Sequence, residues 1–283
     1  MPQTLYYPDP MHKNIEEVEF TIFDTETTGL DPESGDRIIE IAGIRFKADK
    51  KLGDFQTLVN PKRPVSQGAF LVNRISQEML LTAPTIEMVL PKFMDFIYGS
   101  CLCSYNAPFD MGFLRNELKI IGSGFDDNTV VVDILAMARK LLPGLERHAL
   151  CFVAESLGIK DQQQHRAFSD VEITLGIFNK LNSLLKEKGM EDFNTFASIF
   201  GINAGLLNDS NNRKIAKIQG AIEEGSKIRI RYLSRSDANI SEREVMPKEI
   251  KRENNHHYLI GFCCLRNGER TFRIDSILAI DTV

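Results

Sequence analysis

A run of mostly apolar residues near the start of the chain ends in two carboxylates, and this run constrains the fold more than any other stretch. Residues 18–23 suit a buried β-strand, and Asp24 and Glu26 follow them two residues apart. Side chains two apart on a strand point to the same face, so we expect these carboxylates to converge. A turn over residues 27–29 then lets the backbone leave the strand. Such a pair resembles half of a divalent-metal site, although alone it also fits a solvated junction between a strand and a loop.

The length and composition set broad limits on the protein. A chain of 283 residues is long enough for an α/β domain and a smaller second domain. No apolar run approaches the roughly 20 residues that a membrane-spanning helix needs, which predicts no membrane partner. Residues 1–10 lack the basic and apolar segments of a secretion signal, and we expect them to be a poorly ordered lead-in.

The cysteines predict buried thiols rather than disulfides or a zinc site. Their number is odd and their spacing does not suit zinc, which favours a reducing compartment and a cytoplasmic location. The five cysteines are Cys101, Cys103, Cys151, Cys263 and Cys264.

The net charge of −5 is unusual for a protein that binds nucleic acid. It is unevenly distributed, because residues 221–283 hold 11 Lys and Arg against 10 Asp and Glu. An acidic domain can still act on nucleic acid if its carboxylates hold cations that meet the phosphates. The overall charge therefore does not decide the substrate.

The first two thirds of the chain predict a mixed sheet flanked by helices. Strands are expected over residues 18–24, 37–47, 52–59, 100–105 and 129–132. Helices are expected over residues 84–98, 106–121, 147–157 and 167–186, with a further helix from Asp133 to just before Pro143. Pro91 lies inside the first of these helices and should kink it or lie on its outer surface.

The last third of the chain predicts a small all-β module. Residues 186–212 are rich in Gly and Asn, which indicates a linker with room for one short helix. A helix over residues 214–224 leads into the strands, and tight turns are expected at Asn254-Asn255 and Asn267-Gly268. The predicted strands cover residues 227–233, 241–252, 256–265 and 270–280.

Two further stretches carry residue types that suit phosphodiester chemistry. Residues 104–110 place Asp110 in the first turn of a helix, and residues 165–170 place His165 in a loop before Asp170 on the next helix. Taken singly, each has an ordinary explanation. An acidic residue favours a helix N-terminus, and a loop histidine is commonly solvated.

Together with Asp24 and Glu26, these stretches resemble the three motifs of the DEDDh 3′–5′ exonucleases, such as the proofreading subunit of bacterial DNA polymerase III and ribonuclease T. The likeness covers about residues 17–185 and implies a ribonuclease H-like α/β fold. It implies four carboxylate metal ligands, Asp24, Glu26, Asp110 and Asp170, and a catalytic His165. Many members have a histidine before the Asn-Ala pair of the second motif, where this chain has Ser104-Tyr105.

The chemistry of phosphodiester hydrolysis supports this set of residues. Two divalent ions about 3.5–4 Å apart can activate water and neutralise the departing 3′ oxygen. Several carboxylates are needed to hold two such ions, which predicts two Mg²⁺ or Mn²⁺ ions per active site. A base must also take the proton of the water near neutral pH, and His165 suits that role.

Substrate contacts are implied by the same resemblance. The backbone around Thr25 and Thr27 is expected to meet the terminal 3′ hydroxyl, and Phe109 is expected either to pack on the last base or to belong to the core. The implied partners are single-stranded or frayed 3′ ends of DNA, in preference to RNA. A DNA polymerase or a repair or defence protein is an implied partner of the whole chain.

Residues 214–283 resemble a second family, the WYL domains. The resemblance rests on residues 228–232, 245–247, 257–263 and 270–277, although His257 stands in place of the tryptophan and Ser276 at a commonly basic position. It implies a small Sm-like β-barrel that binds nucleic acid or a nucleotide-like ligand. The candidate contacts are Arg231, Tyr258, Arg270 and Arg273; a solvated strand face is the alternative explanation.

The sequence therefore predicts a metal-dependent 3′–5′ exonuclease that releases nucleoside monophosphates and carries an accessory binding domain. The expected division is an exonuclease domain over residues 17–186, a linker over 187–213 and the WYL-like domain over 214–283. The alternative is a non-catalytic nucleic-acid-binding regulator or sensor built on an exonuclease-like platform.

Overall fold

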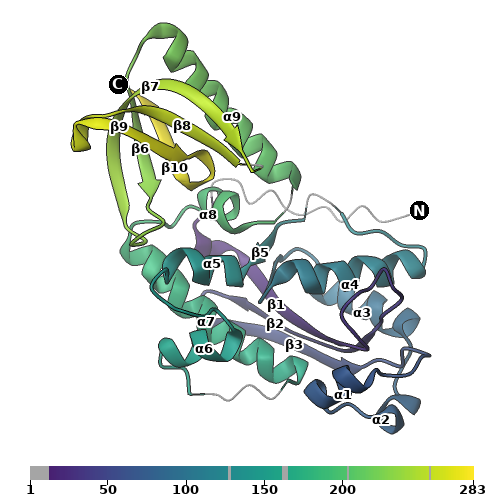
Figure 1. The fold of residues 1–283 in the computed structure, drawn as a ribbon. Coiled ribbons are helices and arrows are strands. Elements are labelled where there is room, and N and C mark those ends of the chain that lie inside the picture. Colours follow the sequence, from purple (N-terminus) through teal and green to yellow (C-terminus); the bar gives the residue numbers. More distant parts are fainter. Residues whose placement is uncertain (1–12, 127–128, 161–164, 203, 255) are drawn as a thin grey trace.

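Two five-stranded sheets organise the molecule, and helices pack around the first of them (Figure 1). The structure is a computed structural model that describes residues 13–126, 129–160, 165–202, 204–254 and 256–283, with side chains described outside 204–210. The expected lead-in over residues 1–10 lies outside the described residues. In the part that is described, no helix is long and apolar enough to cross a membrane.

The first sheet is mixed, as the sequence predicts. Its strand order is β3-β2-β1-β4-β5, in which β1 pairs antiparallel with β2 and parallel with β4. The β2–β3 pairing is antiparallel and the β4–β5 pairing is parallel. The strands are β1 (Glu19–Thr27), β2 (Ile38–Lys47), β3 (Lys50–Leu58), β4 (Cys101–Ser104) and β5 (Val131–Asp133).

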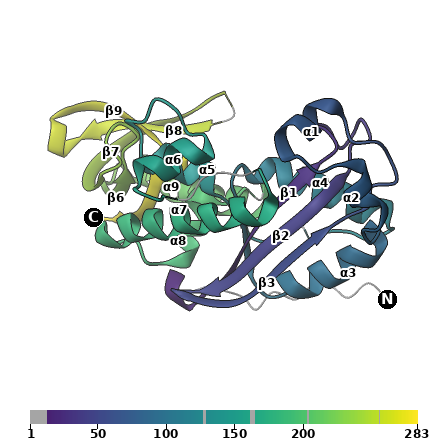
Figure 2. The same cartoon turned by 90° about the horizontal axis from the view of Figure 1, so that it is seen from below.

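Helices cover both faces of this sheet (Figure 2). One face packs against α3 (Ile86–Ile97) and α4 (Ala107–Ile120). The other packs against α5 (Ile134–Leu141), α6 (Leu150–Ser156), α7 (Ala167–Glu187) and α8 (Phe193–Phe200). Pro91 is exposed on α3, which confirms the expectation of an outer-surface position.

The alternation of β1 decides which helices its side chains meet. Ile22 belongs to the core shared with α7, whereas Phe23 belongs to the core shared with α3 and α4. Since side chains alternate along a strand, Asp24 and Glu26 lie on the α7 side, and Thr25 lies on the α4 side.

Two short helices after β3 are missing from the sequence prediction. These are α1 (Gln67–Asn73) and α2 (Gln77–Leu81), and each begins at a serine, Ser66 or Ser76, whose hydroxyl accepts a backbone N–H. Helices of seven and five residues are too short to show an apolar period. The serine caps were the available signal.

The C-terminal sheet follows the long helix α9 (Ala204–Glu224), which begins ten residues earlier than expected. All its pairings are antiparallel, in the order β10-β6-β7-β8-β9. The strands are β6 (Ile228–Leu233), β7 (Ile240–Glu253), β8 (His256–Cys263), β9 (Gly268–Arg273) and β10 (Ile277–Thr282). In the described residues β9 and β10 do not pair, so the expected small barrel takes the form of a sheet that is not closed.

The expected strand over residues 270–280 is two strands in the structure. The 3₁₀ turn η3 (Ile274–Ser276) separates β9 from β10 and lets the chain move from one edge of the sheet to the other. Its Ile274 and Ile277 point into the core of this sheet, so the apolar pattern continues through the turn and hides it from sequence reasoning. Further 3₁₀ turns are η1 (Ile15–Glu17) and η2 (Cys264–Arg266).

The two sheets are joined by shared packing around α8. Phe193, Phe196 and Phe200 of α8 lie in the core of the first sheet. Leu233 and Leu278 of the C-terminal sheet enter the same apolar cluster. The segment expected to be a linker therefore contributes side chains to the core of the first sheet.

All five cysteines are free thiols. Cys101, Cys103 and Cys263 are buried, whereas Cys151 and Cys264 are exposed, so the expectation of buried thiols is wrong for these two. Cys151 lies on the outer side of the short helix α6, and Cys264 follows the end of β8 in the turn η2.

Candidate active site

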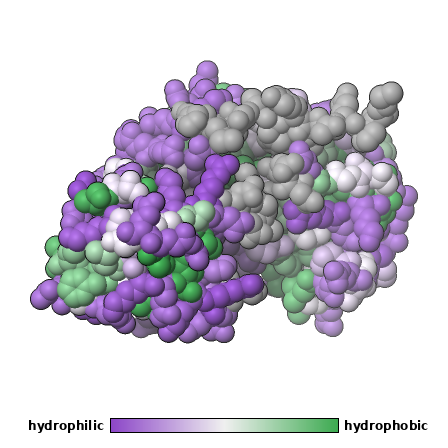
Figure 3. All heavy atoms as spheres, turned by 90° about the horizontal axis from the view of Figure 1, so that it is seen from above, coloured by the Kyte–Doolittle hydropathy of each residue, from purple (hydrophilic) through white to green (hydrophobic). Residues whose placement is uncertain are grey.

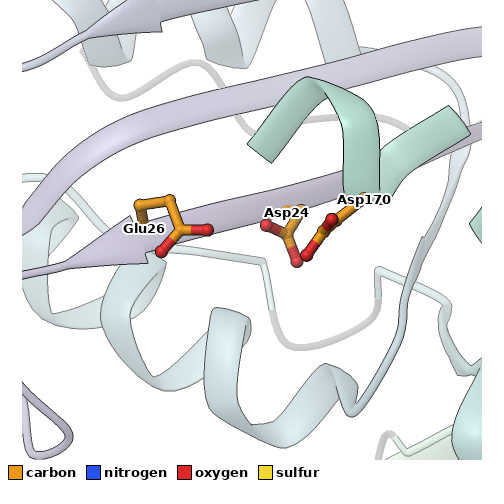
Figure 4. Close-up of side chains that lie close together, drawn as sticks. All are labelled: Asp24, Glu26 and Asp170. Carbon is orange, nitrogen blue, oxygen red and sulfur yellow. The ribbon is translucent and has the colours of Figure 1, made fainter. Parts of the chain in front are cut away.

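Three carboxylates meet at the end of β1. Asp24, Glu26 and Asp170 each place one carboxylate oxygen within 4.8 Å of the others. Figure 4 shows the Asp24 and Asp170 carboxylates directed toward each other, with Glu26 further along the strand. Asp170 lies in the first turn of α7, on the side that the alternation of β1 selects for Asp24 and Glu26.

A buried ion pair fixes the start of α7 over the sheet. Glu40 of β2 lies directly opposite Glu26 in the antiparallel register and is 1% exposed. It accepts hydrogen bonds from Arg166 Nε (3.0 Å), Arg166 Nη2 (2.7 Å) and the Ala167 backbone N–H (3.1 Å). Because the Asp170 N–H in turn donates to the Arg166 carbonyl, Glu40 holds the helical turn that presents Asp170.

Asp110 lies beside this cluster with its carboxylate fixed by other hydrogen bonds. Its Oδ1 accepts from the Thr25 backbone N–H (3.0 Å) and the Thr25 hydroxyl (2.7 Å), and its Oδ2 accepts from the Ser104 hydroxyl. Thr25 points to the α4 side of the sheet, so it meets Asp110 at the start of α4. The structure thus brings together three of the four predicted ligands within 4.8 Å and places the fourth next to them.

Burial and mutual repulsion disfavour the ionised forms of these acids. Burial, followed by the negative charges of Asp110, Glu26 and Asp170, raises the pKa of Asp24 well above its usual range. Burial and the charges of Asp170 and Glu40 raise the pKa of Glu26 to about 8. Burial also raises the pKa of Asp110 to about 6, although the hydrogen bonds from Ser104 and Thr25 act in the opposite direction.

These properties fit a divalent-cation site. Hard cations such as Mg²⁺, Mn²⁺ and Ca²⁺ are bound by oxygen ligands, and the donors that converge here are all carboxylate oxygens. A cation between them would replace repulsion by attraction and keep the acids ionised at neutral pH. Asp24, Glu26 and Asp170 are the residues that would hold it, with Asp110 next to Asp24.

His165 lies two residues before α7 and is exposed. Its backbone has φ of 50°, in the left-handed region, so the chain turns sharply just before the helix. The predicted base is therefore in the loop that leads directly to Asp170.

Thr25, Thr27 and Phe109, the predicted substrate contacts, already interact with other residues of the protein to different extents. The Thr25 side chain is bound to Asp110, and the Thr27 hydroxyl donates to the Gly29 carbonyl at 2.5 Å. Phe109 is half-buried and stacks at a tilt on Phe113, with ring centroids 5.0 Å apart. It combines partial core packing with an accessible edge.

Two residues next to the cluster are missing from the predicted site. They are Glu40 and Asn73, which lies at the end of α1. Asn73 is 2% exposed, and its side chain hydrogen-bonds to Glu26. The signal for Glu40 was an acidic residue inside an otherwise apolar strand over residues 38–44. A buried carboxylate in such a strand requires a partner.

The four candidate contacts of the C-terminal sheet do not form one surface. Tyr258 and Arg273 lie directly opposite each other on β8 and β9. Arg270 is three residues from Arg273 on the same strand and points to the other face. Arg231 donates from Nη2 to the Gly189 carbonyl (3.1 Å) just after α7, so it takes part in the contact between the two sheets.

Comparison with protein families agrees with this geometry. The family model "Exonuclease" (RNase_T) matches residues 21–178, more than half of the chain, and the WYL domain model matches residues 213–282. The chain belongs to the exonuclease family. This family implies divalent metal ions, which agrees with the carboxylate cluster.

Relatives of this exonuclease include DNA polymerase III proteins. A DNA polymerase III subunit epsilon-like protein of Rhodobacter capsulatus is 34% identical over 201 residues, which are 70% of this chain and 28% of the relative. A DNA polymerase III PolC-type protein of Caldanaerobacter subterraneus subsp. tengcongensis is 32% identical over 254 residues, 88% of this chain and 18% of the relative. The chain spans less than a third of either relative's length.

Solved structures of similar fold also belong to nucleases. The nuclease domain of 3′hExo, a DEDDh family member bound to rAMP, has a TM-score of 0.52 and 18% identity over 64% of this chain and 96% of that one. E. coli Exonuclease I in complex with a dA16 oligonucleotide has a TM-score of 0.59 and 17% identity over 87% of this chain and 55% of that one. At these identities the likeness concerns the fold, and the second comparison extends into the C-terminal sheet.

Proposed function

We propose that this protein is a divalent-metal-dependent 3′–5′ exonuclease that releases nucleoside monophosphates from the 3′ end of a nucleic-acid strand. The observation that carries the proposal is the convergence of three carboxylates within 4.8 Å at the end of β1, where burial and repulsion raise the pKa of Asp24 and Glu26. Such a site gains most from a bound cation. Membership of the exonuclease family supports the same chemistry.

Each residue of the site has a proposed role. Two Mg²⁺ or Mn²⁺ ions, held by the four carboxylates, would supply water activation and charge neutralisation at the departing 3′ oxygen. His165, exposed before α7, takes the proton of the attacking water and releases it to solvent. Thr25 orients Asp110 through two hydrogen bonds, and Phe109 offers its accessible ring to the last base.

The proposal is tested with the purified chain and 5′-labelled single strands of DNA and RNA of one sequence, with Mg²⁺ or Mn²⁺. Stepwise shortening from the 3′ end is expected with either metal, faster on DNA, and loss of shortening is expected with Asp24→Ala or with EDTA. Strand binding without shortening under both metals would instead favour a non-catalytic sensor. Undiminished shortening by Asp24→Ala would contradict the assigned site.

We also propose that the C-terminal sheet is an accessory binding domain. Tyr258 offers an aromatic ring on one face of this sheet, opposite Arg273, whose guanidinium is bound to Asp275. The division into residues 17–186, 187–213 and 214–283 is part of this proposal, supported by the two family matches. A polymerase partner is proposed from the relatives, which are DNA polymerase III proteins.

A further inference from the structure

The junction between the two sheets brings half-buried lysines from separate elements near one carboxylate. Lys140 of α5 donates to the Ile199 carbonyl (3.4 Å), and its ammonium lies 5.9 Å from the centre of the Phe200 ring. Lys214 comes from α9, and the charge of Asp275 in η3 acts on both lysines. The two helices and the C-terminal sheet thus enclose a basic cluster.

Asp275 cannot neutralise this cluster, because an arginine already binds it. Arg273 donates to Asp275 Oδ1 from Nε (2.9 Å) and to Oδ2 from Nη2. The Ser276 hydroxyl donates to Oδ1 as well (3.2 Å). One carboxylate therefore faces a guanidinium and two ammonium groups, and the positive charge of the two lysines is in excess.

Unpartnered polar atoms lie on the α9 side of the cluster. Lys214 Nζ and Asn211 Oδ1 are buried and have no hydrogen-bond partner in the described part of the chain. The two residues are three positions apart on α9, so they lie on the same face of that helix. Buried polar groups in native proteins are almost always satisfied. The Lys214 ammonium donates and therefore calls for an acceptor such as a water or an anion, whereas Asn211 Oδ1 accepts and calls for a donor such as a water.

The lysines stay charged despite their burial. Burial lowers the pKa of both Lys140 and Lys214 to about 8, while Asp275 acts in the opposite direction. Both are thus mostly protonated at pH 7. A buried charge without a partner is strongly destabilising, and an anion would remove that penalty.

We propose that this junction binds a phosphate group through Lys140 and Lys214. The two excess ammonium charges suit a phosphate group, which carries about −1.5 to −2 at pH 7 as a monoester and about −1 as the diester of a nucleic-acid backbone. The phosphate can come from a free nucleotide or from a nucleic-acid backbone. The site is separate from the carboxylate cluster and does not depend on the proposed nuclease activity.

Few large apolar side chains are exposed in the described part of the C-terminal sheet. The face in Figure 3 is mainly hydrophilic, with smaller hydrophobic areas. Among the described residues of the C-terminal sheet and its turns, the large exposed apolar side chains are Phe262, Leu265 and Val283.

The first test is thermal unfolding of the full chain in EDTA, with inorganic phosphate or with sodium chloride at equal ionic strength. Phosphate is expected to raise the unfolding midpoint by about 2 °C or more over chloride. Lys140→Met and Lys214→Met should each raise the midpoint without phosphate and abolish the phosphate response. Lys217→Met is the matched control on α9, because Lys217 already donates to the Ile280 carbonyl (3.3 Å), and it should keep the response.

An equal effect of phosphate and chloride on the wild-type chain would overturn the proposal, as would an undiminished response in both variants. If a methionine variant fails to fold, acetylation of wild-type lysines is followed by peptide mass spectrometry. Phosphate should then slow acetylation of Lys140 and Lys214 relative to Lys217. Equal rates with and without phosphate would likewise overturn the site.

The source of the phosphate is distinguished by two further probes. A nucleoside 5′-monophosphate is compared with a single strand that lacks terminal phosphates and carries only backbone phosphates. The unfolding midpoints of the wild-type and Lys214→Met chains are measured in EDTA at the same total concentration of phosphate groups. A Lys214-dependent effect confined to the monophosphate assigns the site to a free nucleotide. A larger effect of the strand assigns it to a nucleic-acid backbone, and no Lys214-dependent effect of either probe contradicts the proposal.

Discussion

Two regions of the molecule each bring together side chains of the same charge. The charges are negative in one region and positive in the other. At the end of β1, Asp24, Glu26 and Asp170 converge. At the junction between the sheets, Lys140 and Lys214 both feel the charge of Asp275, which an arginine already binds. Each arrangement is unfavourable alone and favourable with a ligand of opposite charge, so each points to a ligand.

The two regions differ in how the chain assembles them. Asp24 and Glu26 converge because they are two residues apart on one strand, so local geometry nearly guarantees their proximity. Lys140, Lys214 and Asp275 are 61 or more residues apart and meet only because α8 joins the two sheets. Charge clusters of the first kind can be found from a motif, whereas those of the second kind require the tertiary structure.

The largest effect is expected from Asp24→Asn. Losing one anionic ligand should remove several kcal/mol of transition-state stabilisation, or about 10³-fold in the rate of strand shortening. The same change should stabilise the metal-free chain at pH 8, because it removes one of the repelling acids. The rate of strand shortening and the urea midpoint are measured for the wild-type chain and for Asp24→Asn. Asp49 is exposed, and Asp49→Asn is the control that should alter neither quantity.

The second-largest effect is expected in the pH dependence of stability: the free energy of unfolding of the metal-free chain should have a minimum near pH 8. The folded chain holds a proton on Glu26 up to a pKa of about 8, so its stability should fall as the pH rises from about 4.5 to 8. Lys140 and Lys214, with pKa lowered to about 8, lose protons earlier in the folded chain, so stability should rise from pH 8 to about 10.

Urea unfolding in EDTA across pH 5–10 measures both slopes. Glu26→Gln should flatten the falling limb, and Lys214→Met should flatten the rising limb. Saturating Mg²⁺ should reverse the falling limb, since binding requires ionised acids. A flat profile below pH 8 in EDTA would show that the carboxylates do not repel each other as the structure implies.

A smaller loss is expected from Glu40→Gln, which weakens the anchor of α7. Partners that orient metal ligands typically contribute about 10–100-fold in metal affinity or activity. The matched control is Glu117→Gln, because Glu117 is also 1% exposed and binds Arg37 with two hydrogen bonds on the other side of the sheet.

Both glutamine variants should lose similar stability, and only Glu40→Gln should need more Mg²⁺ for half-maximal activity. Metal titration of the shortening rate and urea unfolding separate the two effects. If both variants reached half-maximal activity at the same Mg²⁺ concentration, Glu40 would contribute to stability but not to the orientation of the metal ligands.

The smallest effect is expected from Arg231→Gln, which removes the hydrogen bond to the Gly189 carbonyl between the two sheets. A loss of about 0.5–1.5 kcal/mol in the free energy of unfolding is expected. Arg229→Gln should cost less, because Arg229 pairs with Glu244 on the exposed face of the C-terminal sheet. A larger loss for Arg229→Gln would show that Arg231 does not support the junction.

The sequence located the ligand-bearing strand and helix and missed what orients them. Asp170 was placed correctly on a helix, but that helix is held through Arg166 by Glu40, which lies 126 residues before Arg166. The short helices α1 and α2 were also missed, and with them Asn73 beside Glu26. Local patterns do not report a hydrogen bond between distant segments, nor a helix too short to repeat its apolar period.

In the C-terminal sheet, the sequence pattern did not predict the path of the chain from strand to strand. The apolar pattern through residues 270–280 is continuous, so it could not show that η3 divides β9 from β10 and leaves the sheet open. It also could not show that Arg231 contacts Gly189 while Arg270 and Arg273 point to opposite faces.

By itself, the sequence determined the mixed sheet of the first domain, the family and the carboxylates that converge at the end of β1, because strand alternation and motif spacing are local properties. Only the tertiary structure decided that Asp110 binds Thr25 and Ser104 beside the cluster, that Glu40 anchors α7, and that the charge of Asp275 acts on lysines from two helices. Those features depend on which segments the core brings together, and packing across the whole chain sets that arrangement.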